Sequence, residues 1–369
     1  MEPIRVLHIV TYMGRGGLET MLMNYYRNID RNKVQFDFLV HRDFEADYDK
    51  EIESLGGRIY RVSKLNPFSR KYLNELDQFF KEHKEYKIVH SHLDCMAGFP
   101  LKYAKKNGIL FRIAHAHSSN QDKNLKYPLK LIFKRNIVKY ANECFACGQV
   151  AGQWMFGGKR FQILNNAIDA KQYIFDYKKR IYVRKMFGID ESTFVVGHVG
   201  RFETVKNHTF LLDVFYELLK KQENSVLLLV GDGTLKNEIK QKCEKLGINK
   251  KVIFAGSRDD VPEILQAMDV FMLPSLYEGL GIVNIEAQAS GLPCLISERV
   301  PMECEKVKGL VTQIDLAKGA KYWAQKMLDQ ANYKRENTYS DILNSGFDIQ
   351  QNGVWLSNFY LENAKKPLE

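Results

Sequence analysis

The chain has 369 residues, 45% of them hydrophobic, a length and composition that suit two folded domains and exclude a disordered protein. It carries 54 lysine and arginine residues against 44 aspartate and glutamate residues, and residues 1–185 alone hold a net charge of +14. A basic half of this kind predicts an anionic partner, and nucleic acid, a phospholipid surface and a phosphorylated acceptor are all candidates.

The sequence contains neither a predicted membrane span nor a recognisable export signal. No apolar run approaches the roughly 20 residues that cross a bilayer, and residues 4–10 are too few and too poorly flanked for a signal peptide. The six cysteines follow no disulfide framework, as expected in a reducing compartment. We therefore expect a cytoplasmic protein, either free or peripheral on the inner face of the plasma membrane.

Apolar runs alternate with helix-compatible stretches along the chain, which predicts α/β domains with parallel sheets covered on both faces. The first series of predicted strands comprises residues 4–10, 34–40, 58–62, 87–91, 110–115, 143–147 and 161–165. The second series comprises residues 193–200, 226–230, 252–254, 270–273 and 294–297. Two doubly wound halves joined near residues 166–190 would bind a ligand in a cleft at the carboxyl ends of their strands.

The first predicted strand leads into a glycine-rich turn that contains Gly16 and Gly17, and a helix follows it. Free N–H groups at a helix start favour an anion, so this turn is a candidate phosphate site. The full G-x-G-x-x-G fingerprint of dinucleotide sites is absent, and a purely structural turn explains the glycines equally well.

Two short motifs raise the question of a metal. Asp47 and Asp49 form a D-x-D within an acidic run, which we interpret as a solvated helix start because acidic residues suit that end of a helix. Cys144 and Cys147 lie on a predicted strand, where residues three apart point to opposite sides, so zinc or redox use is not expected. No other cluster has metal-ligand spacing, and the chain is predicted to need no metal.

Two features of the first half have both a functional and a structural interpretation. His115 and His117 end a predicted strand, where an imidazole could donate a hydrogen bond to a ligand or be an ordinary polar residue. Lys126, Lys130 and Lys134 recur at helical spacing within residues 125–139, opposite an apolar side. That helix could lie on anionic lipid or cover the core of its own domain.

In the second half, basic and glycine residues follow successive predicted strands. Arg201 and Lys206 come after residues 193–200 and could converge on a diphosphate, although a solvated loop is the alternative. Gly231 follows residues 226–230 and either permits close approach of a ligand or forms a tight turn.

The stretch from Pro274 to Ala287, PSLYEGLGIVNIEA, links a buried strand to a helix predicted over residues 283–290. Its carboxylates, Glu278 and Glu286, are separated by roughly 12 Å at most if the intervening residues are helical. They therefore suit two parts of one extended ligand better than a close acid–base pair. Glycines and helix-start N–H groups lie between them, as an anion would require.

This stretch, extended to the closing Gly-Leu-Pro, resembles the signature of family-4 retaining glycosyltransferases of the GT-B fold. The resemblance covers nearly the whole chain and is closest to bacterial enzymes that build capsular and exopolysaccharide repeat units. It implies an acceptor-binding Rossmann-like domain over residues 1–172, a donor-binding one over residues 173–349, and a terminal helix, residues 350–369, that returns to the first domain.

The resemblance also implies roles for individual residues. Glu286 would bind the ribose hydroxyls and Glu278 the hexose hydroxyls of a nucleotide sugar, while Arg201 and Lys206 would stabilise the departing diphosphate. His117, preferred over His115, would contact the donor sugar near its reacting carbon. The remaining contacts would come from the loop at Gly16 and Gly17, from Gly231 and Arg258, and from the backbone N–H groups of Leu280, Gly281, Ile282 and Val283.

The expected reaction is transfer of a hexose from a nucleotide sugar, UDP-linked in the first instance, to a hydroxyl of a lipid-linked glycan. A donor phosphate oxygen would take the acceptor's proton, so the protein would supply no base and need no metal or other cofactor. Two alternatives stay open: a nucleotide-sugar epimerase or hydrolase, and a non-catalytic partner subunit that binds the nucleotide sugar. No nucleic-acid recognition motif appears.

Overall fold

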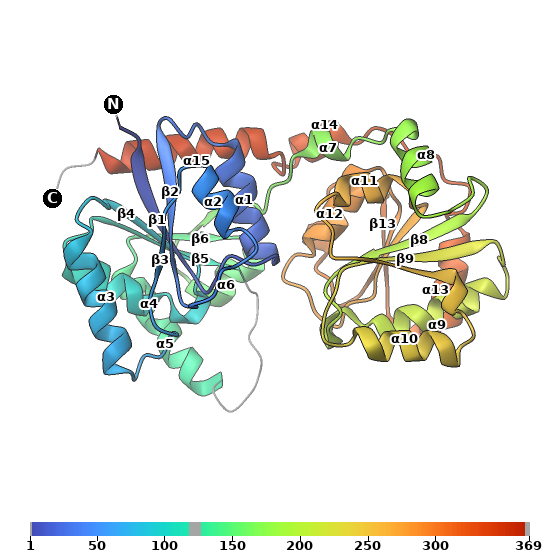
Figure 1. Cartoon of the computed structure of the whole chain (residues 1–369), viewed down its shortest axis with the longest axis horizontal. Helices are drawn as coiled ribbons and strands as arrows, with labels where there is room; N and C mark the ends of the chain where they lie inside the picture. Colours follow the sequence, from blue (N-terminus) through green and yellow to red (C-terminus); the bar gives the residue numbers. More distant parts are fainter. Residues whose placement is uncertain (1, 118–126, 366–369) are drawn as a thin grey trace. The chain divides into compact units, whose positions relative to one another are not determined.

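The computed structural model of the protein describes residues 2–117 and 127–365 (Figure 1). The chain forms two compact α/β units, one comprising residues 1–168 and 346–369 and the other residues 169–345. The sequence predicts divisions after residues 172 and 349, and the observed divisions lie four residues earlier in each case.

The first unit is built on a seven-stranded sheet of parallel strands in the order β3-β2-β1-β4-β5-β6-β7. Its strands are β1 Ile4–Val10, β2 Val34–Val40, β3 Ile59–Arg61, β4 Ile88–Ser91, β5 Phe111–Ala116, β6 Glu143–Ala146 and β7 Gln162–Ile163. All seven were predicted to within two residues at each end. The strand order reverses between β1 and β4, which makes the carboxyl ends of these two strands the expected ligand site of this unit.

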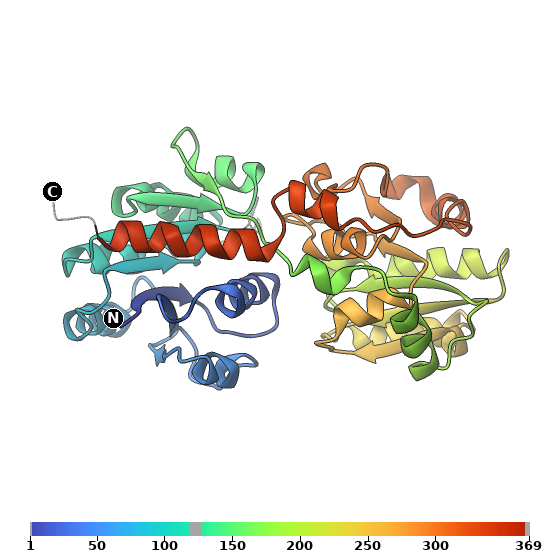
Figure 2. The same cartoon turned by 90° about the horizontal axis from the view of Figure 1, so that it is seen from above.

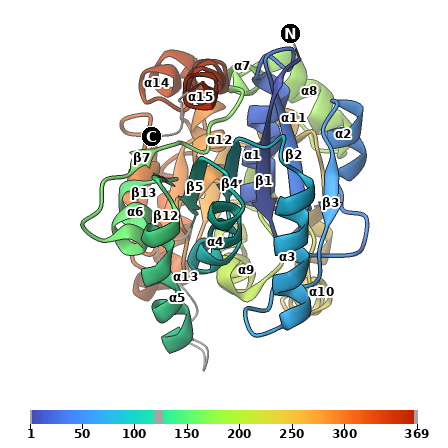
Figure 3. The ribbon, with the colours of Figure 1, turned by 90° about the vertical axis from the view of Figure 1, so that its left-hand side faces the viewer.

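Helices cover both faces of this sheet. They are α1 Gly17–Asn28, α2 Asp49–Ser54, α3 Arg70–Glu82, α4 Gly98–Lys106, α5 Tyr127–Tyr140, α6 Gln149–Phe156 and α15 Ile349–Ala364. The first and last of them share a core with the sheet residues Val6, Phe36 and Ile88, whereas α3 and α4 bury the opposite face. Figures 1 and 3 show α3, α4 and α5 together on the side of the sheet away from α15.

The terminal helix α15 belongs to the first unit although it follows the second in sequence, which confirms the predicted return of this helix (Figure 2). It begins after Asp348, whose side chain accepts hydrogen bonds from the first-turn N–H groups of Gln350 and Gln351. Leu356 and Tyr360 are buried against the first sheet. None of the helices within the described ranges is both long and apolar enough to cross a membrane.

The second unit contains a six-stranded parallel sheet in the order β10-β9-β8-β11-β12-β13. Its strands are β8 Phe194–Val199, β9 Ser225–Val230, β10 Val252–Gly256, β11 Val270–Leu273, β12 Cys294–Ser297 and β13 Val311–Ile314. The edge strand β13 was not predicted, and the other five were. Here the order reverses between β8 and β11, which makes the ends of these strands the expected ligand site of this unit.

Eight helices accompany the second sheet in the described part of the chain. They are α7 Ala170–Tyr173, α8 Tyr177–Met186, α9 His208–Leu219, α10 Lys236–Lys245, α11 Val261–Gln266, α12 Ile282–Ala289, α13 Gly319–Leu328 and α14 Tyr339–Asn344. A core formed with α9, α10 and α13 lies on one face, and Figure 1 shows α11 and α12 on the other. Helix α12, predicted over residues 283–290, begins at the end of the loop that follows β11.

Candidate active site

The two loops at the strand reversal of the second sheet are tied to each other. Lys206 ends the short 3-10 helix Thr204–Lys206 after β8, and Glu278 lies in the loop after β11. Their side chains form an ion pair, Nζ to Oε1, of 2.6 Å, and both are largely buried at 17% and 12% exposure. The Ser275 hydroxyl donates to the same carboxylate oxygen at 2.6 Å, and the Leu276 N–H donates to the Val205 carbonyl.

This arrangement differs in one respect from the sequence prediction. Glu278 was expected to meet a sugar and Lys206 a diphosphate, each separately, whereas the structure pairs them with each other. A lysine held against a carboxylate leaves two of its three N–H donors for an anion. The pair therefore offers a cation and a carboxylate side by side, which suits a ligand that presents phosphate and hydroxyl groups together.

Glu286 lies inside α12 and is 9% exposed. Burial raises the pKa of its carboxyl group to about 7, and the Tyr173 hydroxyl and the Lys206 charge limit that rise. A carboxyl group with such a pKa is poised between an acceptor-only form and a form that can also donate. Tyr173 comes from α7, the first helix of the unit, and nothing in its local sequence marks it as a site residue.

The start of α12 supplies backbone groups to the same edge. Gly281 caps the helix with φ of +74°, a conformation that favours glycine. Ile282 and Val283 form its first turn, where N–H groups have no partner within the helix. Leu280 is buried and anchors the loop. Glycines, helix start and carboxylates thus occur in the predicted order around one loop.

The remaining site residues predicted in the second unit are Arg201, Arg258 and Gly231. Arg201 is exposed and pairs with Glu203 at 3.3 Å, and Arg258 makes two hydrogen bonds, of 2.7 and 2.6 Å, to Asp260. Neither arginine contacts Lys206 or Glu278 in the interactions described. At Gly231, φ is +137° and a Cβ would lie 2.1 Å from the Gly200 carbonyl oxygen, so a tight turn explains this glycine.

In the first unit, the glycine-rich turn after β1 forms the start of α1, with Gly16 as its N-cap and Gly17 as its first residue. The Glu19 carboxylate folds back over this turn, because a Cβ on Gly16 would lie 2.3 Å from its Oε2 atom. A carboxylate therefore occupies part of the space predicted for a phosphate.

His117 follows β5 and is held from both its backbone and its ring. Its N–H donates to the Asp94 carboxylate at 3.0 Å, and its Nε2 atom lies 2.9 Å from Nδ1 of His92. Burial lowers the pKa of His117 to about 3, so the ring is neutral near pH 7 and can both donate and accept. His115 is buried, and neither of its ring nitrogens has a partner within the described residues.

Two sequence predictions in the first unit need correction, and the structure bears on a third. Asp49 does start α2, but it is 3% exposed and paired with Arg61 at 2.6 Å, so this carboxylate is not solvated, whereas Asp47 is exposed as predicted. Lys134 donates to the Trp154 carbonyl and covers its ring, so it is not free for lipid; Lys126 lies outside the described residues. Histidines with metal-ligand spacing also exist: His8, His90 and His92, and His92, His115 and His117.

The histidine groups were missed because each joins residues from two strands, β1 with β4 in the first group and β4 with β5 in the second. The only local signal is the repeated pattern of histidines two apart at two strand ends, His90 with His92 and His115 with His117. Cys144 and Cys147 are both buried, and neither forms a disulfide bond in the structure.

Some known proteins are similar to this chain over nearly its whole length, and others are similar over only part of it. A family profile described as Glycosyl transferases group 1 matches residues 180–329. A Bacillus subtilis protein named as the glycosyltransferase EpsF is 36% identical over 98% of this chain and 97% of its own length. The Staphylococcus aureus capsular polysaccharide biosynthesis glycosyltransferase CapH is 24% identical over 98% of this chain and 99% of its own. An Escherichia coli UDP-Gal:alpha-D-GlcNAc-diphosphoundecaprenol alpha-1,3-galactosyltransferase is 33% identical over 37% and 36% of the two chains.

Solved structures agree on the fold. Anabaena HepE in complex with UDP superposes with a TM-score of 0.81 at 17% identity, over 97% of this chain and 100% of HepE. WaaG, a glycosyltransferase involved in lipopolysaccharide biosynthesis, superposes with a TM-score of 0.63 at 16% identity, over 98% of this chain and 100% of WaaG. The full-length relation to EpsF, the matched profile and the two Rossmann-like sheets together show that the chain belongs to the group 1 glycosyltransferases, of family-4 type and GT-B fold, and is a glycosyltransferase of polysaccharide biosynthesis.

Proposed function

We propose that the protein transfers a hexose, with retention of configuration, from a UDP-sugar to a hydroxyl of a lipid-linked glycan. The observation that carries this proposal is the pairing of Lys206 with Glu278 beside the N-terminus of α12. Cation, carboxylate and helix-start N–H groups then occur together at the strand reversal, where α/β sheets bind ligands. The E. coli relative's name gives UDP-galactose as donor and a diphosphoundecaprenol-linked sugar as acceptor, which supports the assignment of both substrates.

Each residue has a defined role in the proposed reaction. Glu286 accepts hydrogen bonds from the ribose hydroxyls, and Glu278 accepts them from the hexose. As the bond between the anomeric carbon and the leaving phosphate oxygen breaks, Lys206 and Arg201 stabilise the charge that builds up on the diphosphate. The acceptor oxygen forms its bond to the same face of the sugar and gives its proton to a donor phosphate oxygen. His117 contacts the sugar as a neutral imidazole, and catalysis proceeds without a metal.

Calorimetric titration of UDP in EDTA tests the donor site. The parent protein should bind UDP without metal, and Glu286→Ala should bind it at least about tenfold more weakly because the ribose contact is lost. Glu244→Ala, which removes an exposed carboxylate on α10, is the matched control and should bind like the parent. UDP binding that requires a divalent metal, or that survives Glu286→Ala unchanged, would contradict the proposed site.

Product analysis separates transfer from the alternatives. Incubation with a UDP-sugar alone should leave the sugar intact, and addition of a glycan acceptor should produce UDP and a lengthened glycan. Release or isomerisation of the sugar without an acceptor would indicate a hydrolase or an epimerase. Binding of UDP-sugar without any product, across donors and acceptors, would indicate a non-catalytic partner subunit.

A further inference from the structure

Five histidines gather on one face of the first sheet, the face covered by α15. His8 lies on β1, His90 on β4 and His115 on β5. His92 follows the end of β4, and His117 follows the end of β5. His8 and His90 stand directly opposite each other in the parallel register, with ring centroids 5.3 Å apart. All except His117 are at most 4% exposed. The proposed transfer reaction uses only His117, and the role of the others needs a separate explanation.

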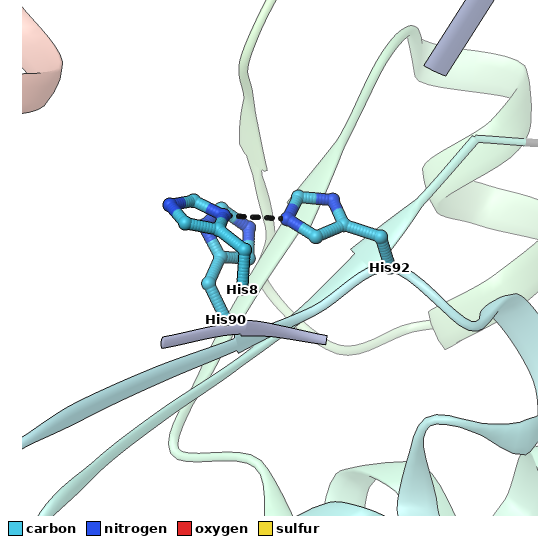
Figure 4. Close-up of side chains that lie close together, drawn as sticks. All are labelled: His8, His90 and His92. Carbon is cyan, nitrogen blue, oxygen red and sulfur yellow. Dashed lines mark hydrogen bonds between the residues drawn. The ribbon is translucent and has the colours of Figure 1, made fainter. Parts of the chain in front are cut away.

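Three of these rings converge on one point. Nδ1 of His8 lies 3.0 Å from Nε2 of His92, and His90 stacks on His92 with ring centroids 4.2 Å apart. One ring nitrogen from each of the three lies within 4.8 Å of the other two. Figure 4 shows His8 and His92 facing each other, with His90 beside His8.

This spacing is close to what a metal ion requires. Tetrahedral zinc bonds imidazole nitrogen at about 2.0–2.1 Å, which places two ligand nitrogens roughly 3.3 Å apart. The His8–His92 pair is within a few tenths of an ångström of that separation. The third ring needs to move by about 1–1.5 Å, within the reach of small side-chain rotations.

Other groups orient two of the rings as partners of metal-bound histidines do. Nδ1 of His90 lies 2.7 Å from the Tyr360 hydroxyl, which leaves Nε2 of His90 without a partner among the described residues. Nδ1 of His92 lies 2.9 Å from His117. In metal sites, a histidine that binds the ion through one nitrogen usually donates from the other, which fixes the tautomer and the ring orientation.

The surroundings favour the form of histidine that binds metals. His8 packs against the rings of Phe36 and Phe38, and His90 against Phe145. Burial among these rings keeps the pKa of His8 and His90 below the ordinary value, so their imidazoles are neutral, as ligands must be. A buried ring nitrogen without a hydrogen bond is costly, and a bound ion would satisfy that of His90.

We infer that His8, His90 and His92 bind one divalent transition-metal ion of the class that prefers imidazole ligands, Zn²⁺ in the first instance. The ion would clip β1 to β4 where the strand order reverses, with Tyr360 and His117 orienting the ligands from outside. Its effect is structural, on the first unit, and it is independent of the metal-free transfer proposed for the donor site.

Metal titration of the protein without a polyhistidine tag tests this site. After treatment with EDTA and dialysis, the parent should bind one equivalent of Zn²⁺ and melt at a higher temperature when it is bound. Co²⁺ in its place should show the visible absorption of a tetrahedral ion. Binding of less than half an equivalent, or no Co²⁺ spectrum, would overturn the proposal.

Variants assign the ion to these residues. Tyr360→Phe keeps the ring and removes only the hydroxyl, and should weaken Zn²⁺ binding by about 10–100-fold, as is usual when such a supporting partner is lost. His90→Gln should abolish binding, while His83→Asn, which removes a histidine outside the group, should leave it unchanged. His115→Gln discriminates between the two histidine groups: retained binding supports the assignment, whereas loss would place the ion among His92, His115 and His117 and overturn it.

Discussion

At the scale of the residue, the local sequence singled out side chains whose proposed roles follow from their positions along the chain. Glu278, Glu286 and Lys206 follow predicted strands or lie in a predicted helix, and the structure brings Lys206 to Glu278. Ser275 and Tyr173 were not singled out, because their contacts depend on how the loop after β11 folds and on where α7 packs. A side chain that supports another residue leaves no periodic signal of its own.

The pKa of Glu286, raised to about 7 by burial, predicts a pH dependence of stability. As the pH rises from about 4.5, the carboxyl group ionises in the unfolded chain while it stays protonated in the folded one. The free energy of unfolding should therefore fall between about pH 4.5 and 7, by a few kcal/mol at most, and level off above pH 7. Glu286→Gln cannot ionise and should lack this component.

Urea unfolding of both proteins at pH 5, 6, 7 and 8 measures the effect. Other groups titrate in this range too, so the quantity to compare is the difference in free energy of unfolding between variant and parent. That difference should move in favour of Glu286→Gln as the pH rises. A difference that stays constant from pH 5 to 8 would mean that the carboxyl group keeps its ordinary pKa.

The position of Lys206 in its ion pair with Glu278 predicts a contribution of this lysine to the transfer rate. Lys206→Met removes the charge that faces the departing diphosphate, so the transfer rate should fall by about 10²–10³-fold, the usual effect of losing one such group. Steady-state kinetics with a UDP-sugar and a glycan acceptor would measure it. Lys242→Met, which breaks the ion pair with Asp213 on α10 and α9, is the control and should keep the parent rate. Equal transfer rates for the two variants would show that Lys206 takes no part in the reaction.

At the scale of the element, the alternation of apolar runs with helix-compatible stretches located all but one of the strands. Strand β11 is a continuous apolar run and β1 is mostly apolar, with Arg5 and His8 within it, and both were predicted at their observed positions. Strand β13, an edge strand of four residues with only one of them buried, was missed, although the shorter edge strands β3 and β7 were predicted. Asp49, at the start of α2, was predicted to be solvated because its partner, Arg61, lies on β3, twelve residues further along the chain.

The N-cap of α15 carries a prediction for this element. Asp348 is 1% exposed and accepts hydrogen bonds from the N–H groups of Gln350 and Gln351 at 3.0 and 3.4 Å. Asp348→Ala should lower the free energy of unfolding by about 1 kcal/mol, the usual cost of losing such a cap. Asp341→Ala, which removes an exposed acidic side chain from the first turn of α14, is the control. Urea unfolding would show the difference, and equal losses would mean that the cap contributes nothing beyond charge.

At the scale of the whole molecule, the resemblance and the strand pattern together predicted two doubly wound units and a terminal helix that belongs to the first. The unit boundaries were displaced by four residues, because Ile168 pairs with Asp348 in an isolated parallel bridge that fastens both crossing segments to the first unit. A pairing between residues so far apart in sequence leaves no mark on either segment alone. The histidine group was hidden for the same reason, since it depends on the register of β1 against β4.

The positive charge of the first half predicts binding to an anionic membrane surface. Residues 1–185 hold a net charge of +14, and α5, within them, exposes Ile132, Arg135 and Lys139. If a lipid-linked acceptor draws the protein to an anionic surface, the protein should pellet with vesicles that contain phosphatidylglycerol and not with vesicles of pure phosphatidylcholine. Raising NaCl from about 0.1 to 1 M shortens the Debye length from about 10 to 3 Å, so pelleting should decline with salt.

A double variant separates the contribution of α5 from that of the whole basic half. Arg135→Glu with Lys139→Glu should reduce pelleting well below that of Lys245→Glu with Lys250→Glu, an equal charge change on exposed residues of the second unit. If both pairs reduce pelleting equally, net charge and not α5 governs the association. If neither the parent nor the variants pellet, the basic half does not bind an anionic lipid surface, and a phosphorylated acceptor becomes the next anionic partner to test.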